Sequence, residues 1–244
     1  AGYTASGSKG TSTITYGNLG TKGSLNSGDA FDCDVNGDGE YNSDTERFYY
    51  VSDYYNASTK LFESDTAVLI YYNNVNLGNP NNNTKSSYDS SGENWHGPRT
   101  AIEQLPTTSQ WNNVSLKNIS RTILNENSSN ITTGGTLPNK FSYEGYSSRL
   151  ITIQEVRKAA HNDNIPIWKV GELDDYNYFV ENTSFSSPNG RNLAYWLETP
   201  CSDSSSFAFG VYGHNRNVGS NDVPHLGVYS VRPAIEVSKT NIEY

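Results

Sequence analysis

The strongest constraint on the fold lies towards the C-terminal end of the chain, in residues 193–237. This segment opens with an apolar, aromatic run and closes with a second apolar run at residues 228–237. Between the two runs, Ser, Gly, Asn and Asp alternate with Phe, Tyr, His and Arg, a mixture typical of surface strands and loops. Short apolar runs of this kind indicate buried strands. We therefore expect a closing strand held in the core and, just before it, an exposed segment, residues 202–229, which we call the display segment.

Composition favours short strands and long loops over helices. Only 34% of the 244 residues are hydrophobic and 18% are charged, while 18 are Tyr and none is Met. Asn, Ser, Thr and Gly make up the difference, and these residues suit turns and loops. The clearest strands are residues 47–54 and 66–73, two β-branched or aromatic runs that we expect in a central sheet.

Two short helices are expected. Residues 97–105 place Pro98 at the first helical position and stop before Pro106. Residues 148–161 carry Thr152 with Glu155 three positions later, which is the pattern of a capping box. Apolar runs extend from end to end without a Gly/Ser-rich linker, so we expect a single α+β domain over residues 1–244, with residues 1–46 as an N-terminal extension.

Charge and hydropathy exclude two classes of partner. The formal net charge of −9 disfavours nucleic acid, because phosphate binding needs a basic face. No apolar run approaches the roughly 20 residues that a transmembrane helix requires, so no membrane insertion is expected. The two cysteines, Cys33 and Cys201, could form a disulfide that closes a very long loop or remain two partly buried thiols.

Residues 34–45 follow the spacing of a calcium-binding loop and resemble a dockerin or EF-hand loop. In such a loop the odd positions project oxygen atoms inward, and Gly39 makes the sharp turn. The twelfth position, normally a bidentate acid, is Thr45, with Asp44 and Glu46 on either side. The alternative is an acidic Asn-Gly/Asp-Gly turn without a metal. The predicted calcium ligands are Asp34, Asn36, Asp38, the Glu40 carbonyl and Asn42.

The display segment carries the residue types that dominate binding surfaces, namely aromatics, Arg and Asn. Strand alternation places Phe207, Phe209 and Val211 on one face, opposite the small residues Ala208 and Gly210. The alternative is that the Phe side chains belong to the core and that the polar residues are merely solvated. The candidate ligand-binding residues are Phe207, Phe209, Tyr212, His214, Asn215, Arg216, Asn221, Asp222, His225 and Tyr229.

Catalysis is not favoured by the motifs. Nucleophilic catalysis needs a nucleophile beside an oriented base, and the serines at 204–206 lack a G-x-S-x-G context. A sugar-binding C-type lectin would show an E-P-N or Q-P-D triplet with a W-N-D partner. The nearest fragment here is Trp111-Asn112-Asn113, and the triplet is absent. We therefore expect no enzyme and no calcium-mediated sugar site.

Three stretches carry a family resemblance: S-R-L-I-T-I-Q-E-V at 148–156, Y-W-L-E-T-P at 195–200 and G-V-Y-S-V-R-P-A-I-E-V-S at 227–238. They resemble bacterial proteins with a C-type-lectin-like fold of the formylglycine-generating-enzyme type. More narrowly, they are similar to the variable proteins of diversity-generating retroelements. The resemblance implies small twisted antiparallel sheets, two short helices, long irregular loops and a buried V-R-P strand. Formylglycine-generating enzymes use paired cysteines near the C-terminal end, where this chain has only Cys201, so the resemblance implies the fold and not the activity.

The resemblance also implies a role. We expect a non-enzymatic recognition protein, extracellular or at the bacterial cell surface, that binds an unknown protein or cell-surface ligand through the display segment. One alternative is a structural or adhesive surface module, such as a pilus-tip domain, that calcium stiffens. Another is a carbohydrate-binding domain.

Overall fold

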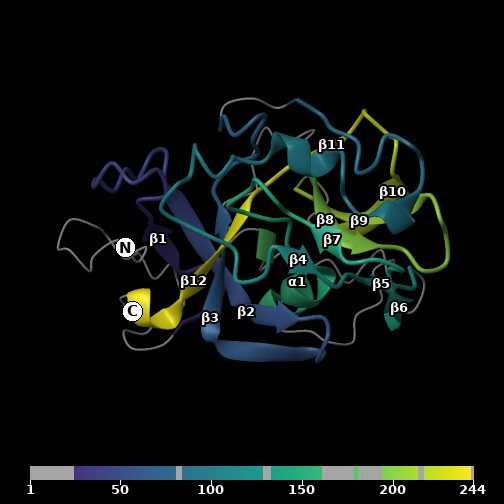
Figure 1. Cartoon of the computed structure of the whole chain (residues 1–244), viewed down its shortest axis with the longest axis horizontal. Coiled ribbons are helices and arrows are strands. Elements are labelled where there is room, and N and C mark those ends of the chain that lie inside the picture. The colour runs from purple at the N-terminus through teal and green to yellow at the C-terminus, as the bar shows by residue number, and fades with distance from the viewer. Residues whose placement is uncertain are drawn as a thin grey trace.

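Two four-stranded sheets organise the computed structural model, which describes residues 25–80, 84–128, 133–160, 179–180, 183, 194–213 and 217–242. Figure 1 shows the first sheet on the left, near both labelled termini, and the second on the right. The first sheet has the order β1 (Ala30–Asp32), β2 (Arg47–Asn56), β3 (Leu61–Tyr71) and β12 (Ala234–Ser238). The second has the order β10 (Asn217–Asp222), β9 (Phe207–Tyr212), β8 (Ala194–Pro200) and β11 (Tyr229–Ser230).

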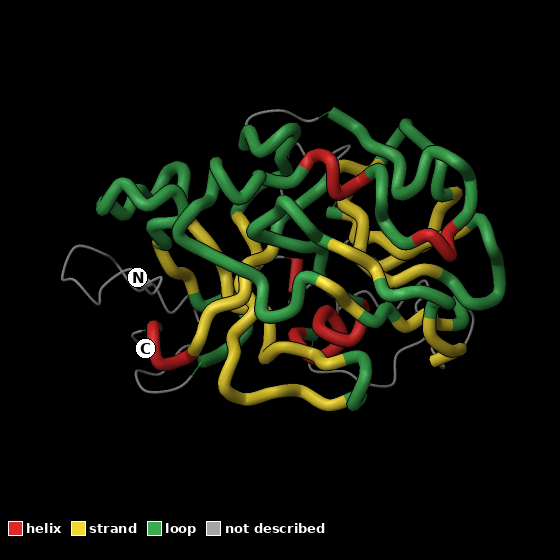
Figure 2. Tube along the Cα trace, in the orientation of Figure 1, coloured by secondary structure: helices red, strands yellow, loops and turns green. Residues whose placement is uncertain are grey.

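Smaller elements and long loops connect the two sheets (Figure 2). Two short antiparallel ladders join β4 (Ser120–Arg121) to β7 (Phe141–Ser142) and β5 (Leu124–Glu126) to β6 (Thr133–Thr136). The remaining elements are α1 (Ile153–Ala159) and three 3-10 turns, η1 (Asn94–His96), η2 (Ala101–Gln104) and η3 (Lys239–Asn241). The described part of the chain is therefore rich in small, mostly antiparallel sheets with a single α-helix. This agrees with the α+β class at a coarse level.

The prediction of a helix at 97–105 is wrong, because the chain forms only the single 3-10 turn η2 there. The N–H groups of Thr100 and Ala101 donate to the carbonyl of Tyr88 at 3.2 Å, which ties this segment to a neighbouring loop. Leu105 is already extended, as the residue before a proline prefers. The segment is too short for an α-helix to propagate before Pro106 ends it.

β3 is the central strand of the first sheet, as its continuous apolar run predicts. It pairs antiparallel with β2 on one side and with β12 on the other. Alternate side chains enter two different hydrophobic cores. Leu69 and Tyr71 belong to one cluster, which we call the first core, while Val68 and Ile70 belong to the other, the second core. Because both faces of the strand are covered, its sequence shows no alternation of polar and apolar residues.

α1 packs into the second core, between the two sheets. Ile153 and Val156 lie with Val51 of β2 and Leu197 of β8. The capping box predicted at its start is present: the Thr152 hydroxyl accepts from the Glu155 N–H, and the Glu155 carboxylate accepts from the Thr152 N–H at 2.9 Å. This helix therefore begins one residue after Thr152, where the sequence places it.

The closing run is two short strands rather than one. β11 pairs parallel with β8 in the second sheet, and β12 pairs antiparallel with β3 in the first. Between them the chain crosses from one sheet to the other through the buried Arg232, whose Nε donates to the Tyr71 carbonyl at 2.6 Å. Its Nη2 also donates to the carbonyl of Thr183. The V-R-P stretch thus lies in the interior and links the two sheets.

The disulfide considered from the sequence is absent: Cys33 and Cys201 are not joined. Each is buried, Cys33 in the first core and Cys201 in the second, so they belong to different clusters. Burial raises the pKa of the Cys201 thiol to about 12, and the nearby Asp203 raises it further. Both cysteines therefore act as small apolar core residues.

Candidate functional site

The display segment forms a hairpin with loops at its base. β9 and β10 pair antiparallel, with Phe207 opposite Asp222 at the open end and Tyr212 opposite Asn217 near the turn. Residues His214, Asn215 and Arg216 of that turn lie outside the described residues, and so do the predictions made for them. The exposed part that the structure describes is thus at the open end, where the loops 201–206 and 223–228 begin.

The prediction that Phe209 and Tyr229 bind a ligand is wrong, because both side chains are fully buried. Phe209 lies in the second core, and Tyr229 stacks on Trp196 with ring centroids 4.1 Å apart in the first. Gly210 leaves room for this tyrosine, since a Cβ at that position would come within 2.1 Å of the Tyr229 ring. The second sheet is covered on both faces, so only the ends of its strands reach solvent.

The other candidates among the described residues are at least partly accessible. Phe207 has 37% of its surface exposed. Its ladder partner Asp222 and the nearby His225 are also exposed. Tyr212 and Asn221 are half-buried. Leu226, which the sequence did not single out, is 65% exposed.

A third loop, residues 86–96, lies against the loops 201–206 and 223–228. The sequence did not predict that it contributes an exposed side chain there. Trp95 of η1 is 44% exposed, although Trp is normally an interior residue. The preceding Asn94 is buried, and its side-chain amide donates to the carbonyls of Cys201 at 2.9 Å, Ser204 at 2.6 Å and Phe207 at 2.7 Å. The only sequence signal was a single tryptophan within a long polar stretch.

Main-chain hydrogen bonds hold the three loops in one arrangement. Val223 N donates to the Ser206 carbonyl at 2.8 Å, and Tyr88 N donates to the Val223 carbonyl at 2.9 Å. Asn94 N donates to the Ser205 carbonyl at 2.7 Å. We call five of the exposed side chains on these loops the display face: Trp95, Phe207, Asp222, His225 and Leu226.

Asp89 fixes the edge of the display face. This buried carboxylate bonds His96 Nδ1 at 2.6 Å and Arg99 Nε at 2.9 Å, and it also accepts from Ser91. Burial alone would raise the pKa of Asp89, but these hydrogen bonds outweigh it and keep the pKa below its ordinary value. The His96 ring in turn lies 3.7 Å from the Trp95 ring, centroid to centroid, so it supports the tryptophan from one side.

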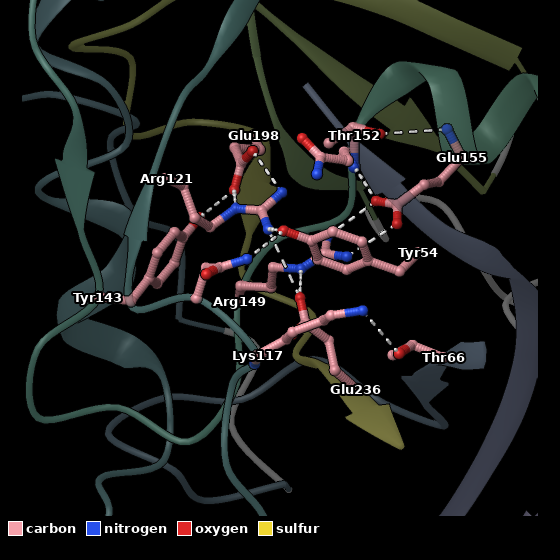
Figure 3. Close-up of polar contacts among 12 residues, drawn as sticks. Tyr54, Thr66, Lys117, Arg121, Tyr143, Arg149, Thr152, Glu155, Glu198 and Glu236 are labelled. Carbon is pink, nitrogen blue, oxygen red and sulfur yellow. Dashed lines mark hydrogen bonds and ion pairs between the residues drawn. The ribbon is translucent and has the colours of Figure 1, made fainter. Parts of the chain in front are cut away.

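A buried network of ion pairs connects the two sheets with α1 (Figure 3). Arg149, just before α1, contacts Glu155 at 2.8 Å and Glu236 of β12 at 2.5 Å. Arg121 contacts Glu198 of β8 at 2.9 Å, and Tyr143 donates to the same carboxylate at 2.8 Å. The network joins both sheets to the helix, so Arg149 has the structural role that its position in an apolar run predicts. Arg232 has such a role through its bonds to main-chain carbonyls.

Tyr54 lies at the centre of this network. The Arg121 and Arg149 guanidinium carbons are 5.5 and 5.6 Å from the centre of its ring, within the range of a cation–π contact. Burial would raise the pKa of the Glu155 carboxyl, yet the adjacent Arg149 keeps this pKa below its usual value. Every charge in the network therefore faces an opposite charge, and we find no acid or base there that is left for chemistry.

A cavity of about 430 Å³ lies elsewhere among the described residues. It is bordered by Asp65, Asn113, Lys117 and Glu236, together with other mostly polar residues, and by no residue of the display face. Lys117 Nζ contacts Glu63 at 2.5 Å and Asp65 at 3.2 Å, so the charges at its mouth pair with one another. The cavity is polar, unlike the predominantly apolar pockets that bind most small molecules.

The predicted calcium loop has the internal hydrogen bonds of such a loop. Asp34 Oδ2 accepts from Gly39 N at 3.1 Å, Asn36 Oδ1 from Asp38 N at 2.9 Å, and Asp38 Oδ1 from Glu40 N at 2.8 Å. Glu46, by contrast, is buried and turns its carboxylate back towards Asn42, whose N–H donates to it at 2.9 Å. Among the described residues, no three His, Cys, Asp or Glu side chains are gathered closely enough to form a metal cluster.

Burial raises the pKa of Glu46 to about 7. The hydrogen bond from Asn42 opposes this, but the negative charges of Asp38 and Asp34 add to it. The same loop is fixed to the rest of the fold by Asn113, whose side chain donates to the Asp34 carbonyl at 2.7 Å.

Comparison of the chain with protein-family models, with curated proteins and with solved structures found no match. None of the helices in the described ranges is long and apolar enough to cross a membrane.

Proposed function

We propose that this chain is a non-enzymatic recognition domain that binds a protein or cell-surface ligand through its display face. The observation that carries the proposal is that two exposed aromatic side chains, Trp95 and Phe207, lie on segments that one buried residue, Asn94, holds together. A protein exposes large aromatics on ordered loops at a cost in solvation, and such positions are typical of binding hot spots.

Preorganisation supports the proposal. Binding is weakened by the entropy of ordering loops and side chains, so a surface that is already ordered retains more of its contact energy. Trp and Phe each have only two side-chain dihedrals, and they supply large contact areas at low entropic cost. Asp222 and His225 add adaptable polar groups beside them.

The resemblance to retroelement variable proteins points the same way. It implies that variation is concentrated just before a buried closing strand, and here β12 is buried while the loops before it carry the display face. On the same resemblance, we propose that the protein acts outside the cell or at the bacterial surface.

Alanine variants at the display face test the proposal. Trp95→Ala and Phe207→Ala would be compared with Leu61→Ala and Ile119→Ala, which remove apolar side chains elsewhere that are at least as exposed. Binding would be measured against an array of bacterial and host surface proteins and a glycan array. We expect the first pair to abolish signals that the second pair leaves intact. Equal effects of both pairs, or glycan signals that require calcium but not the display face, would contradict the proposal.

A further inference from the structure

We propose that residues 34–46 bind one calcium ion, and that Glu46 supplies the carboxylate which a loop of this spacing takes from its twelfth position. The proposal is independent of the recognition function, because none of these residues belongs to the display face. It also modifies the ligand set expected from the sequence, which did not include Glu46.

The first observation is a pair of carboxylate oxygens without hydrogen-bond partners. Asp34 is 7% exposed and Glu46 is 3% exposed, and the buried oxygens Asp34 Oδ1 and Glu46 Oε1 have no partner within hydrogen-bonding geometry, although the Val35 backbone lies close enough to oppose the rise in the pKa of Glu46. Leaving a charged oxygen in this state is costly, and buried polar atoms are nearly always satisfied. A cation between the two carboxylates would satisfy both oxygens.

The second observation is the direction of Glu46. Its Oε2 is held by the Asn42 N–H at 2.9 Å, while the charges of Asp34 and Asp38 act on the same carboxylate. The side chain is thus turned back over the loop rather than away from it. One residue beyond the usual position, Glu46 can serve because the chain between Asn42 and Glu46 forms a tight turn, in which Glu46 N donates to the Asn42 carbonyl at 2.7 Å.

The remaining ligands lie on the exposed half of the loop. Asn36 and Asp38 currently bond each other, since Asn36 Nδ2 donates to Asp38 Oδ2 at 3.0 Å. Residues 36–40 are exposed, so binding would exchange this contact for the ion and draw that half of the loop inward. This explains why the acidic side chains are not yet gathered around a single point.

The donor set selects calcium. All the donors are carboxylate, amide or carbonyl oxygens, which favour hard cations over zinc or copper. The loop is irregular and exposed on one side, a property that suits the variable coordination of calcium better than the strict octahedron of magnesium.

Binding would stabilise the fold, because the loop is attached to the first sheet at several points. Cys33 N donates to the Glu46 carbonyl at 2.9 Å, and Tyr71 Oη donates to the Thr45 carbonyl at 2.6 Å. An ion that binds only the folded chain raises its stability by mass action.

The test is calorimetry of the full chain with calcium chloride, with magnesium chloride as the comparison, together with melting curves in calcium and in EDTA. We expect one calcium per chain, a Kd of roughly 10⁻⁵ to 10⁻³ M, and a higher melting temperature in calcium. Glu46→Gln should weaken binding about tenfold or more and remove the calcium-dependent shift.

The matched control is Asp44→Asn, which removes an exposed carboxylate from the same loop. It should bind calcium as the parent does. Both variants are melted in EDTA first, and Glu46→Gln should be at least as stable as the parent there, because it removes a buried charge. Absence of heat and of any melting shift in the parent would overturn the proposal. Equal losses in both variants would show diffuse attraction to acidic residues instead, and unchanged binding in Glu46→Gln would exclude Glu46 as a ligand.

Discussion

The side-chain amide of Asn94 donates to the main-chain carbonyl of Phe207 at 2.7 Å, across a separation of 113 residues in the chain. The same amide reaches the carbonyls of Cys201 and Ser204. One buried residue thus fixes the position of the loop that carries an exposed phenylalanine and of the turn that carries an exposed tryptophan.

Replacing Asn94 should loosen the display face. Asn94→Ala leaves the buried Cys201 carbonyl and the partly buried carbonyls of Ser204 and Phe207 without this donor, and we expect a loss of about 2–3 kcal/mol in the free energy of unfolding. Amide hydrogen exchange should become faster in residues 201–207, while Asn139→Ala, which removes an exposed amide, should change neither quantity. Unchanged exchange in residues 201–207 would show that the loop is held by other contacts.

Phe207 and Phe209 should respond oppositely to truncation, although they are two residues apart on the same strand. Phe209 is fully buried, so Phe209→Ala should cost about 3–5 kcal/mol in the free energy of unfolding. Phe207 is at the exposed end, and Phe207→Ala should cost less than about 1 kcal/mol. Urea unfolding of the two variants measures both values, and similar costs would place Phe207 in the core.

Asp29 should make stability depend on pH. Its carboxyl is fully buried, and burial raises its pKa to about 6, against a value near 4 when unfolded. Because the folded pKa is the higher one, the protonated form favours folding below pH 4, and this contribution is lost as pH rises through 6. Asp29→Asn should therefore gain up to about 3 kcal/mol on the parent between pH 4 and 7. Unfolding titrations at several pH values measure the difference, and a constant difference would mean that Asp29 does not titrate in this range.

The buried ion network should matter far more than the surface one. Arg149→Met leaves the buried Glu155 without an ion-pair partner and removes one of the two arginines that contact Glu236, and we expect a loss of about 3–5 kcal/mol in the free energy of unfolding. Lys117→Met breaks the contacts with Glu63 and Asp65 at the cavity mouth, and we expect a loss below about 1 kcal/mol because these groups are partly exposed. Chemical denaturation compares the two variants, and a small effect for Arg149 would be the unexpected result.

Local patterns were enough to predict the strands β2 and β3 and the start of α1. In each case the decisive interactions lie within a few residues, as with the hydrogen bonds between Thr152 and Glu155. The helix expected at 97–105 was wrong because its N–H groups bond a loop that the local sequence does not specify.

The candidate site depended on distant contacts and was predicted only in part. Alternation correctly grouped Phe209 with Val211, but it cannot show that α1 and the first sheet cover that face. Trp95 was missed because its exposure follows from contacts of Asn94 with residues more than 100 positions away. The role of Glu46 was missed because it lies one position beyond the ligand spacing that the motif defines.

The most direct measurement of the central claim is the melting temperature of one variant in which all five residues of the display face are replaced by Ser, combined with its binding on the protein and glycan arrays. Because these exposed side chains belong to neither hydrophobic core, we expect the variant to melt within about 5 °C of the parent. We also expect it to lose the parent's binding signals. A fall of more than about 15 °C, or full retention of those signals, would contradict the claim that a rigid frame presents this face for recognition.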